Sequence, residues 1–413
     1  MKENILFVID SLECAGAEKS LVTLLSLLDF EKYSVDLFLF GHGGELEELV
    51  PPEVNLLDPA AYSIYSKLPM NIALFNTFIN SEYRNLCSRL EFTLKLRTGK
   101  YRNSQKARIF WQSTSRAFKQ NKKEYDIAIS YAQGVPTFYV AEKIRAKKKF
   151  AWVNVSYRLD EKEQAFQKQY YDVYDRIVAV SDSTKEVFLE AFPNYKNKMN
   201  VIYDINNPEF INRMAKIGTG YEDGFDGVRI LTIGRLANQK GYDIALDACK
   251  QLKESGLHFR WYALGKGPLQ QEIEHKIKEY GLSDHFILLG VKSNPYPYIA
   301  NADLYVQTSR FEGFGLAIAE ARMLNIPVVT TEFDAVYNQM VQRKNGLVTG
   351  MDGESVAEGI NELLNNRALY KKIVEYLKKE KKGNIEELDK FYQLIEGQEV
   401  DNSEEKESAV YAH

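Results

Sequence analysis

Short apolar runs alternate with amphipathic segments along the first half of the chain. Ile5–Ile9 and Val35–Phe40 have the length and composition of buried strands, and Ala17–Leu28 has the apolar spacing of a helix. The same rhythm returns further on, with strands expected at Ile127–Tyr131, Phe150–Val153 and Ile177–Ser181. Short buried strands separated by helices are typical of parallel sheets, so this half predicts a doubly wound α/β domain.

The rhythm stops at residues 218–227 and then restarts. Four glycines and three acidic residues leave this stretch too little apolar surface to form a core, which indicates a surface loop or linker. Beyond it, strands are expected at Ile230–Ile233, His258–Leu264, Phe286–Leu289, Leu304–Gln307 and Val328–Thr331, and helices at Tyr242–Lys253, Leu269–Tyr280 and Leu316–Leu324. We therefore expect a second Rossmann-like unit, with the two parallel sheets facing a central cleft where ligands bind.

These patterns predict the domain boundaries. An N-terminal domain should cover 1–205, a linker 206–227 and a C-terminal domain 228–380. Helical spacing at Leu369–Lys382 and Ile385–Ile395 predicts two last helices, the second within 381–396. Residues 397–413 are acidic and poor in apolar residues, so we expect a frayed or disordered tail.

A basic helical insertion is predicted at about 62–123. Thirteen Lys and Arg face two Glu, which gives this segment a net charge of +11 in a chain of net charge -4. Apolar residues recur every three or four positions from Leu68 to Leu94, as in an amphipathic helix. Two interpretations stay open: a core-facing helix with a solvated basic face, or a patch that meets an anionic membrane or a phosphorylated acceptor.

Composition excludes several classes of protein. The 413 residues are 45% hydrophobic and 27% charged, as in a globular protein, and the net charge argues against nucleic acid as a partner. Three distant cysteines and five scattered histidines form no metal-ligand pattern, so no metal site is expected. Ile5–Ile9 is too short for a signal sequence, and no apolar run reaches membrane-spanning length. A cytoplasmic protein is the expectation, with the inner face of the cell membrane as a further location.

The strongest chemical pattern begins at Ser309, after one predicted strand and before a helix. Gly313 and Gly315 let the backbone approach a ligand closely. The free N–H groups of the following helix start suit anions or sugar hydroxyls, and they belong to Gly313, Phe314, Gly315 and Leu316. Glu312 lies at the mouth of this turn and Glu320 two turns into the helix, so the two carboxylates can accept hydrogen bonds from different rings of one ligand.

Two further loops carry candidate residues. Arg235 and Lys240 follow a strand and precede a helix, where two cations can converge on a diphosphate. Glu13–Glu18 follows the first strand, and Gly16 in it permits a close phosphate contact at a helix start. Simple turn chemistry explains that second loop equally well.

Together, Arg235, Lys240 and the Glu312–Glu320 pair resemble the retaining GT-B glycosyltransferases of family four (glycosyl transferases group 1), of the type that builds bacterial surface polysaccharides. The resemblance is most specific from Val228 to Glu362. It implies that Arg235 and Lys240 hold the diphosphate of a nucleotide sugar, that Glu312 contacts the transferred sugar, and that Glu320 contacts the ribose. It also implies that Gly16 lies beside the phosphates, that Gly265 faces the cleft near the nucleotide, and that the backbone around Val291 meets the base. The final helix would cross back to the N-terminal domain.

One position departs from that pattern. Asn154 stands at a strand end where many relatives carry a histidine, and an amide binds hydroxyls but does not titrate. The implied activity is transfer, without a metal or other cofactor, from a nucleotide-diphosphate sugar to a glycan or lipid-linked acceptor. The alternative is a non-catalytic subunit that binds and stabilises a partner glycosyltransferase. A dehydrogenase fingerprint, a P-loop and an Asp-x-Asp motif are all absent from the sequence.

Overall fold

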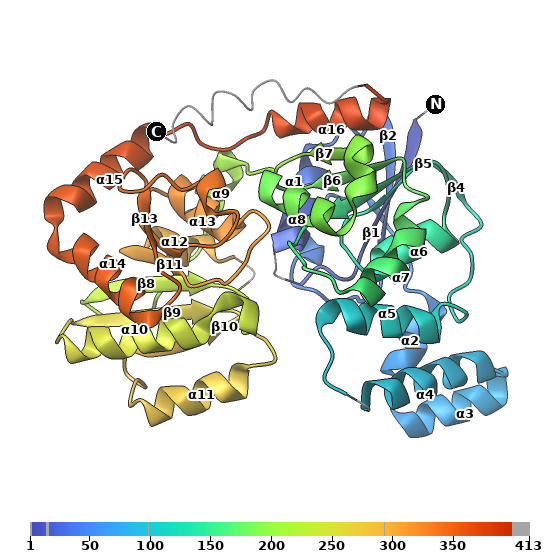
Figure 1. The fold of residues 1–413 in the computed structure, drawn as a ribbon, viewed down its shortest axis with the longest axis horizontal. Helices are drawn as coiled ribbons and strands as arrows, with labels where there is room; N and C mark the ends of the chain where they lie inside the picture. Colours follow the sequence, from blue (N-terminus) through green and yellow to red (C-terminus); the bar gives the residue numbers. More distant parts are fainter. Residues whose placement is uncertain (1, 14–15, 98, 293, 399–413) are drawn as a thin grey trace. The chain divides into compact units, whose positions relative to one another are not determined.

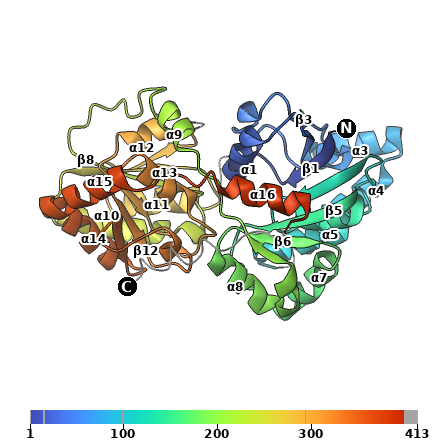
Figure 2. The ribbon, with the colours of Figure 1, turned by 90° about the horizontal axis from the view of Figure 1, so that it is seen from above.

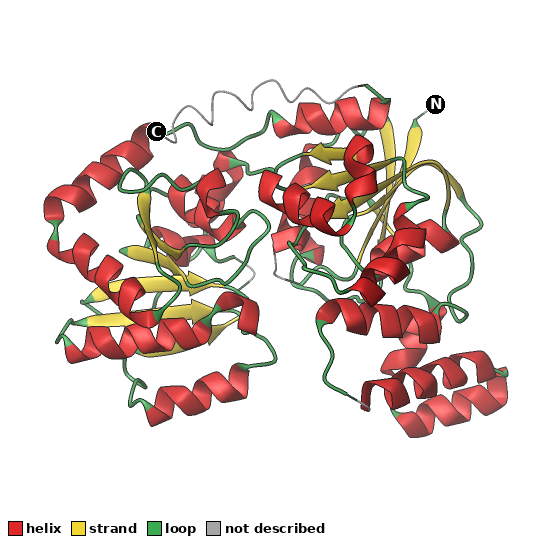
Figure 3. Ribbon diagram, viewed as in Figure 1, coloured by secondary structure: helices red, strands yellow, loops and turns green. Residues whose placement is uncertain are grey.

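The computed structural model describes residues 2–13, 16–97, 99–292 and 294–398. The chain divides after Ile202 into two compact units, each built around its own parallel sheet. Figure 1 labels the helices and strands, and Figure 3 shows the strands of each sheet lying between helices. The predicted α/β class with two parallel sheets is confirmed.

The first unit holds a seven-stranded sheet in the order β3-β2-β1-β4-β5-β6-β7. All neighbouring strands run parallel. The strands are β1 (Glu3–Ile9), β2 (Tyr33–Leu39), β3 (Asn55–Leu56), β4 (Glu124–Ser130), β5 (Arg145–Val153), β6 (Arg176–Ala179) and β7 (Met199–Val201). The helices are α1 (Gly16–Leu27), α2 (Ala61–Lys67), α3 (Met70–Asn80), α4 (Tyr83–Arg97), α5 (Asn103–Thr114), α6 (Val135–Lys143), α7 (Glu161–Tyr171) and α8 (Asp182–Ala191).

The second unit repeats the plan with six parallel strands in the order β10-β9-β8-β11-β12-β13. They are β8 (Val228–Ile233), β9 (Phe259–Leu264), β10 (Phe286–Gly290), β11 (Leu304–Gln307), β12 (Val328–Thr331) and β13 (Gly346–Thr349). The helices are α9 (Pro208–Ala215), α10 (Tyr242–Glu254), α11 (Gln270–Glu279), α12 (Tyr296–Ala300), α13 (Leu316–Met323), α14 (Gly353–Asn365), α15 (Arg367–Lys379) and α16 (Glu387–Glu396).

In each sheet the order in which the chain adds strands reverses beside the first strand of the unit. In the second unit the chain moves outward from β8 to β10, then returns to the other side of β8 with β11. The loops after β8 and β11 therefore diverge at the carboxyl edge of the sheet and leave room for a ligand. Apolar side chains bury this sheet on both faces, with Trp261 and Ile360 on one and Tyr262 and Ile318 on the other.

The stretch predicted as a linker contains a helix. Asn207 caps α9 by accepting from the N–H groups of Glu209 and Phe210, and Pro208 fits its first turn. Ile211 is buried in one core cluster of the second unit, so α9 is part of that unit. The glycine-rich residues 218–227 form bends and irregular backbone, as predicted.

The end of the chain also differs from the predicted helices. α15 ends at Lys379, and α16 begins only at Glu387, so residues 381–386 of the predicted final helix are not helical. Asn384 holds this connection, because its side chain accepts from the N–H of Asn206 and donates to the carbonyl of Asp204. The crossing of α16 to the other domain stays a prediction. Residues 399–413 of the predicted tail lie outside the described residues.

The basic insertion is built from four helices rather than one long amphipathic helix. Leu68 has an extended backbone before Pro69, and Ser81 adopts the left-handed conformation, so the helical stretch is broken at both places. Figures 1 and 2 show α3 and α4 at the periphery of the first unit, beyond α2 and α5. Across the described parts of the chain, no helix has the length and apolar character needed to cross a membrane.

Candidate active site

Arg235 follows β8 directly and is exposed. Its guanidinium has no ion pair or side-chain hydrogen bond with any residue that the structure describes. The guanidinium is a planar donor that suits phosphate oxygens, and here it is free to take one. Lys240 lies five residues later, with its methylene groups packed over Gly234, where an added Cβ would come within 3.1 Å of them.

Glu312 and Lys240 form an ion pair. The ammonium of Lys240 lies 2.5 Å from Glu312 Oε1, and the Glu312 side chain is 9% exposed. The same oxygen accepts from the hydroxyl of Ser309 at 2.5 Å and from the amide of Gln307 at 3.3 Å. The charges of Lys240 and Glu312 offset each other. The hydroxyl of Ser309 and the amide of Gln307 fix the carboxylate in one orientation.

Close backbone contacts join the ends of three strands. Gly265 follows β9, and a Cβ on it would lie 2.0 Å from the carbonyl oxygen of Gly234. Gly241 has a φ of 61°, and a Cβ there would lie 2.0 Å from the carbonyl oxygen of Thr308, after β11. Only glycine permits both contacts, so the loops that carry Arg235, Lys240 and Glu312 are held together at one edge of the sheet.

The turn before α13 has the predicted form. Gly315 adopts a left-handed φ of 83° and caps the helix, which begins at Leu316. The amide of Gln339 donates to the carbonyl oxygens of Phe314 and Gly315, at 3.2 Å for the latter. Helix α13 begins at Leu316, so its first N–H groups have no intrahelical acceptor and form the positive end of the helix. Gly313, Phe314 and Gly315 lead directly into this end.

Glu320 is on α13 and is 3% exposed. Its Oε1 accepts from the hydroxyl of Tyr296 at 3.0 Å. Burial raises the pKa of the neighbouring Tyr305 well above its ordinary value, a hydrogen bond with Ile233 opposes this, and the charges of Glu320 and Glu312 add to the rise. Both carboxylates therefore disfavour ionisation of the same buried phenol.

The second unit thus brings together most of the predicted residues. Val291 follows β10 and is half-buried, and the preceding Gly290 accepts from the N–H of Gly265 at 2.9 Å. Asn154 is carried by the first unit. Gly16 begins α1, and Asn154 follows β5.

Asn154 has an unsatisfied amide. Both its oxygen and its nitrogen are buried, and neither has a hydrogen-bond partner among the described residues. A buried polar group without a partner costs about 1–3 kcal/mol, so folded proteins keep few of them. An amide in this state at a strand end fits a residue that completes its hydrogen bonds with a ligand.

Several residues of the site were not predicted. Gln307 and Ser309 are fully buried and orient Glu312, Tyr296 binds Glu320, and Gln339 holds the turn before α13. Gln307 and Ser309 alternate along the end of a buried strand, where a polar residue has no core to pack into. This alternation of polar residues could have indicated that Gln307 and Ser309 belong to the site. Nothing in the sequence connects Gln339 with Phe314.

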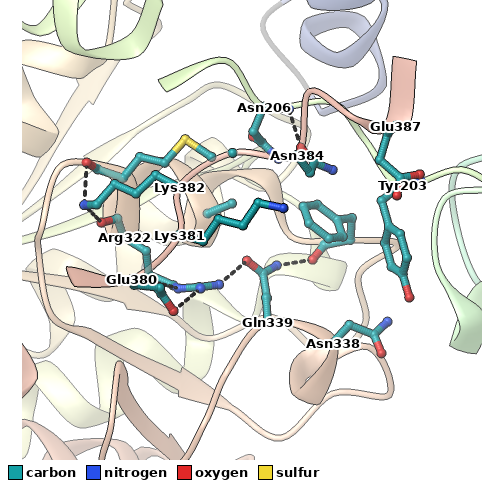
Figure 4. Close-up of a pocket in the computed structure, with 14 residues that line it drawn as sticks. Tyr203, Asn206, Arg322, Asn338, Gln339, Glu380, Lys381, Lys382, Asn384 and Glu387 are labelled. Carbon is teal, nitrogen blue, oxygen red and sulfur yellow. Dashed lines mark hydrogen bonds and ion pairs between the residues drawn. The ribbon is translucent and has the colours of Figure 1, made fainter. Parts of the chain in front are cut away.

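A cavity of about 240 Å³ lies behind this turn. Its lining residues, drawn in Figure 4, all belong to the second unit. Arg322 pairs with Glu380 at 2.5 Å and donates to Gln339. Lys382 donates to the carbonyl oxygens of Arg322 and Met323, each at 2.9 Å, at the end of α13. Burial lowers the pKa of Lys382 to about 8. These charged groups already have partners, and their contacts hold the C-terminal end of α13 in place.

Comparison with known proteins identifies the second unit. The family Glycosyl transferases group 1 matches residues 226–380. The predicted resemblance to this family is therefore confirmed for this part of the chain.

Two curated relatives match part of the chain. An N-acetylgalactosamine-N,N'-diacetylbacillosaminyl-diphospho-undecaprenol 4-alpha-N-acetylgalactosaminyltransferase of Campylobacter jejuni is 28% identical over 203 residues, 49% of this chain and 54% of the relative. The putative colanic acid biosynthesis glycosyltransferase WcaL of Escherichia coli K12 is 31% identical over 140 residues, 32% of this chain and 34% of the relative. The alignments thus span only about a third to a half of these relatives.

Solved structures match nearly the whole fold. Anabaena Alr3699/HepE, in complex with UDP and glucose, has a TM-score of 0.63 at 17% identity, covering 91% of this chain and 93% of that one. A TarM variant of S. aureus, in complex with Fondaparinux, alpha-GlcNAc-glycerol and UDP, has a TM-score of 0.65 at 14% identity, covering 95% and 99%. The chain has the GT-B fold, as predicted.

Proposed function

We propose that this protein is a retaining, metal-independent glycosyltransferase. It moves a sugar from a nucleotide-diphosphate sugar to a glycan or lipid-linked acceptor in the synthesis of a cell-surface polysaccharide. The observation that carries the proposal is the set at the carboxyl edge of the second sheet. It consists of Arg235, which has no ion-pair partner among the described residues, the Lys240–Glu312 ion pair and the start of α13. The relatives named for an undecaprenol-linked acceptor and for colanic acid synthesis support the acceptor class.

The donor diphosphate is the natural ligand of this set. Arg235 and Lys240 supply two positive charges, and the N–H groups at the start of α13 supply further donors. Glu320 takes the ribose hydroxyls, with the backbone at Gly265 close to the phosphates and that at Val291 beside the base. UDP in the solved relatives supports a nucleoside diphosphate in general.

The reaction breaks the bond between the anomeric carbon and the diphosphate oxygen. Negative charge grows on that oxygen, where Arg235 and Lys240 stabilise it without a metal ion. The acceptor hydroxyl attacks from the same face, and its proton passes to the departing diphosphate. When the phosphate oxygens engage Lys240, Glu312 loses part of its ion pair and gains a hydroxyl of the transferred sugar as a partner.

Asn154 belongs to the acceptor side of the proposal. Its amide, which has no partner among the residues that the structure describes, binds a hydroxyl of the donor sugar or of the acceptor. Gly16 leaves room for the phosphates. Because an amide does not ionise near neutral pH, Asn154 positions this hydroxyl and takes no proton from it.

The location is part of the same proposal. The protein works in the cytoplasm, at the inner face of the membrane, and the basic 62–123 segment attracts anionic lipid. A nucleotide sugar and a lipid-linked acceptor meet at that surface.

The test is release of nucleoside diphosphate from a panel of nucleotide sugars incubated with the purified chain. Many glycosyltransferases hydrolyse their donor slowly, so no acceptor needs to be known. Release with one donor is expected, and Glu312→Gln should abolish it while Glu358→Gln, at an exposed site on α14, should not. Binding of a donor without turnover, even with membrane lipid added, would favour the partner-subunit alternative.

A chelator tests the metal-free mechanism in the same assay. Release should be unchanged in excess EDTA, because Arg235 and Lys240 provide the positive charge that a metal supplies elsewhere. A strict requirement for added Mg²⁺ or Mn²⁺ would contradict this part of the proposal.

A further inference from the structure

Helix α3 turns its large apolar side chains away from the protein. Phe75 is 65% exposed, Phe78 82% and Ile79 62%. The side of α3 that faces the protein carries Ala73 and Thr77, both buried. Thr77 exchanges a hydrogen bond of 2.6 Å with the hydroxyl of Tyr65. This orientation is the reverse of a surface helix that packs on a core, and the core-facing interpretation of this segment is wrong for α3.

Helix α4 continues the apolar surface. Tyr83, Leu90 and Leu94 are exposed and spaced at i, i+7 and i+11, so they share one face of the helix. α3 and α4 pack against each other as a helical hairpin. Figures 1 and 2 show the two helices side by side at the edge of the first unit. A monomer in water rarely leaves so many large apolar residues exposed together.

Cations flank this surface, and α3 itself has no charged residue. Lys67 precedes α3, while Arg97 ends α4 on the face of Tyr83 and Leu90. Arg84 and Lys100 are also exposed, and none of these four has an ion pair with any described residue. The exposed acid of α4, Glu91, pairs with Lys95 at 2.5 Å. Thus the cations that border the apolar surface have no ion-pair partner among the described residues, and the carboxylate of Glu91 is already paired with Lys95.

We propose that the α3–α4 hairpin inserts shallowly into an anionic lipid bilayer. Its apolar side chains enter the boundary between headgroups and acyl chains, and the flanking cations contact lipid phosphates. A second copy of the chain fits less well, because a symmetric contact would bring the same unpaired cations together. The apolar surface, rather than the +11 charge alone, anchors the protein.

This inference rests on the proposed function, because membrane insertion serves an enzyme whose acceptor is linked to a lipid. A lipid-linked acceptor presents its reactive end at the membrane surface, and a hairpin seated in the lipid would hold the first unit there. Vesicle binding needs no donor or acceptor, so it can be tested whether or not the chain proves to be an enzyme.

The first test is co-sedimentation of the full chain with vesicles of phosphatidylcholine alone or mixed with phosphatidylglycerol. Wild type should bind the anionic vesicles and retain part of that binding at high salt, because insertion is not screened. The double variant Phe75→Asp/Phe78→Asp should weaken binding by at least about tenfold. A matched control, Val173→Asp/Ile217→Asp, adds the same charge at two other exposed apolar sites and should bind like wild type.

Charge reversal separates the two contributions. Arg84→Glu/Arg97→Glu should remove the preference for anionic over neutral vesicles, which the Phe variants should not do selectively. All variants change exposed residues, so thermal unfolding and donor hydrolysis should match wild type. A wild type that ignores anionic vesicles, or equal binding by the Phe and control variants, would overturn the proposal.

The second test measures depth. The three tryptophans of the chain, Trp111, Trp152 and Trp261, are buried, so Phe78→Trp adds an exposed reporter. Lipids brominated on the acyl chain should quench its fluorescence, and a water-soluble quencher should lose access when vesicles are added. Unchanged access would refute insertion. Dimers in lipid-free solution that Phe75→Asp/Phe78→Asp disperses, without vesicle binding by wild type, would assign the surface to a second copy instead.

Discussion

Arg235 and Lys240 are both basic residues of one loop, but the protein uses them differently. Lys240 is committed to Glu312, with its stem packed on Gly234, whereas Arg235 is exposed and unpaired among the described residues. A charge that is already paired contributes to stability as well as to binding. A charge without a partner contributes to binding alone, which makes Arg235 the cleaner probe of the donor site.

Arg235→Ala should therefore lower donor turnover by about 10²–10³, the usual effect of losing one preorganised charge contact. Its thermal stability should match wild type, because no contact within the described chain is lost. Steady-state kinetics and differential scanning fluorimetry measure the two effects, with Arg367→Ala, at another exposed arginine, as control. A fall in stability without a fall in turnover would remove Arg235 from the site.

Asn154 should show the opposite relation between stability and activity. Asn154→Ala removes a buried amide whose two polar atoms have no partner in the described part of the chain. We expect the free energy of unfolding to stay equal or rise by about 1 kcal/mol. Turnover should fall modestly, and the pH–rate profile should keep its shape because Asn does not ionise. Denaturant unfolding and initial rates decide the matter. Clear destabilisation would mean that the amide serves the fold and not a ligand.

At the scale of elements, the two ends of α10 offer a matched comparison. Gly241 precedes α10 and Gly256 follows it, and both have positive φ values, 61° and 77°. A Cβ on Gly241 would meet the carbonyl of Thr308, while one on Gly256 meets nothing within 4 Å. Gly256→Ala should thus cost only the conformational strain, roughly 1 kcal/mol, and leave turnover unchanged.

Gly241→Ala has the same strain, and it must also move Lys240 or the loop that carries Glu312. We expect a loss of donor turnover much larger than for Gly256→Ala, together with a larger drop in melting temperature. If the two variants behave alike, the contact between the ends of β8 and β11 does not control the site.

In the first unit, strands β2 and β4 are joined by a buried carboxylate. Burial of Asp36 favours its neutral form, but hydrogen bonds from Lys123, Asn55 and Tyr125 outweigh this and hold its pKa below the usual 3.8. The stabilisation from Asp36 is therefore present above the unfolded-state pKa and is lost as the pH falls through the lower folded-state value. Wild type should exceed Asp36→Asn in melting temperature at pH 7, and the gap should close under acid. A gap independent of pH would exclude this linkage.

Sequence patterns predicted the elements of this protein better than their contacts. Glu312 and Glu320 could be placed because strand, glycine turn and helix follow one another locally around them. The orientation of α3 could not be predicted, since Leu74, Phe75 and Phe78 give the same periodicity whether they face a core or solvent. Gln339 was missed for a related reason. Its contact with Phe314 joins loops 25 residues apart, and only the fold brings them together.

At the scale of the whole molecule, the region that matches the family and the candidate donor site lie in the same unit. The family match covers 226–380, which holds Arg235, Lys240, Glu312 and Glu320. The first unit carries Asn154 and the α3–α4 hairpin outside that match. The proposed donor site therefore lies in the part of the chain that matches the family, and the proposed acceptor and membrane contacts lie outside that part.

This division predicts how a nucleoside diphosphate changes unfolding. Two compact units with separate cores can unfold in two calorimetric transitions, and a ligand held by the second unit should raise the transition of that unit. At a concentration of about 100 times its dissociation constant, the ligand adds about 2.7 kcal/mol of stability. Arg235→Ala/Lys240→Ala should abolish the shift, and Arg367→Ala should preserve it. The destabilised transition of Asp36→Asn at neutral pH identifies the first unit independently. If the diphosphate shifted only the transition of the first unit, the assignment of the donor site to the second unit would be wrong.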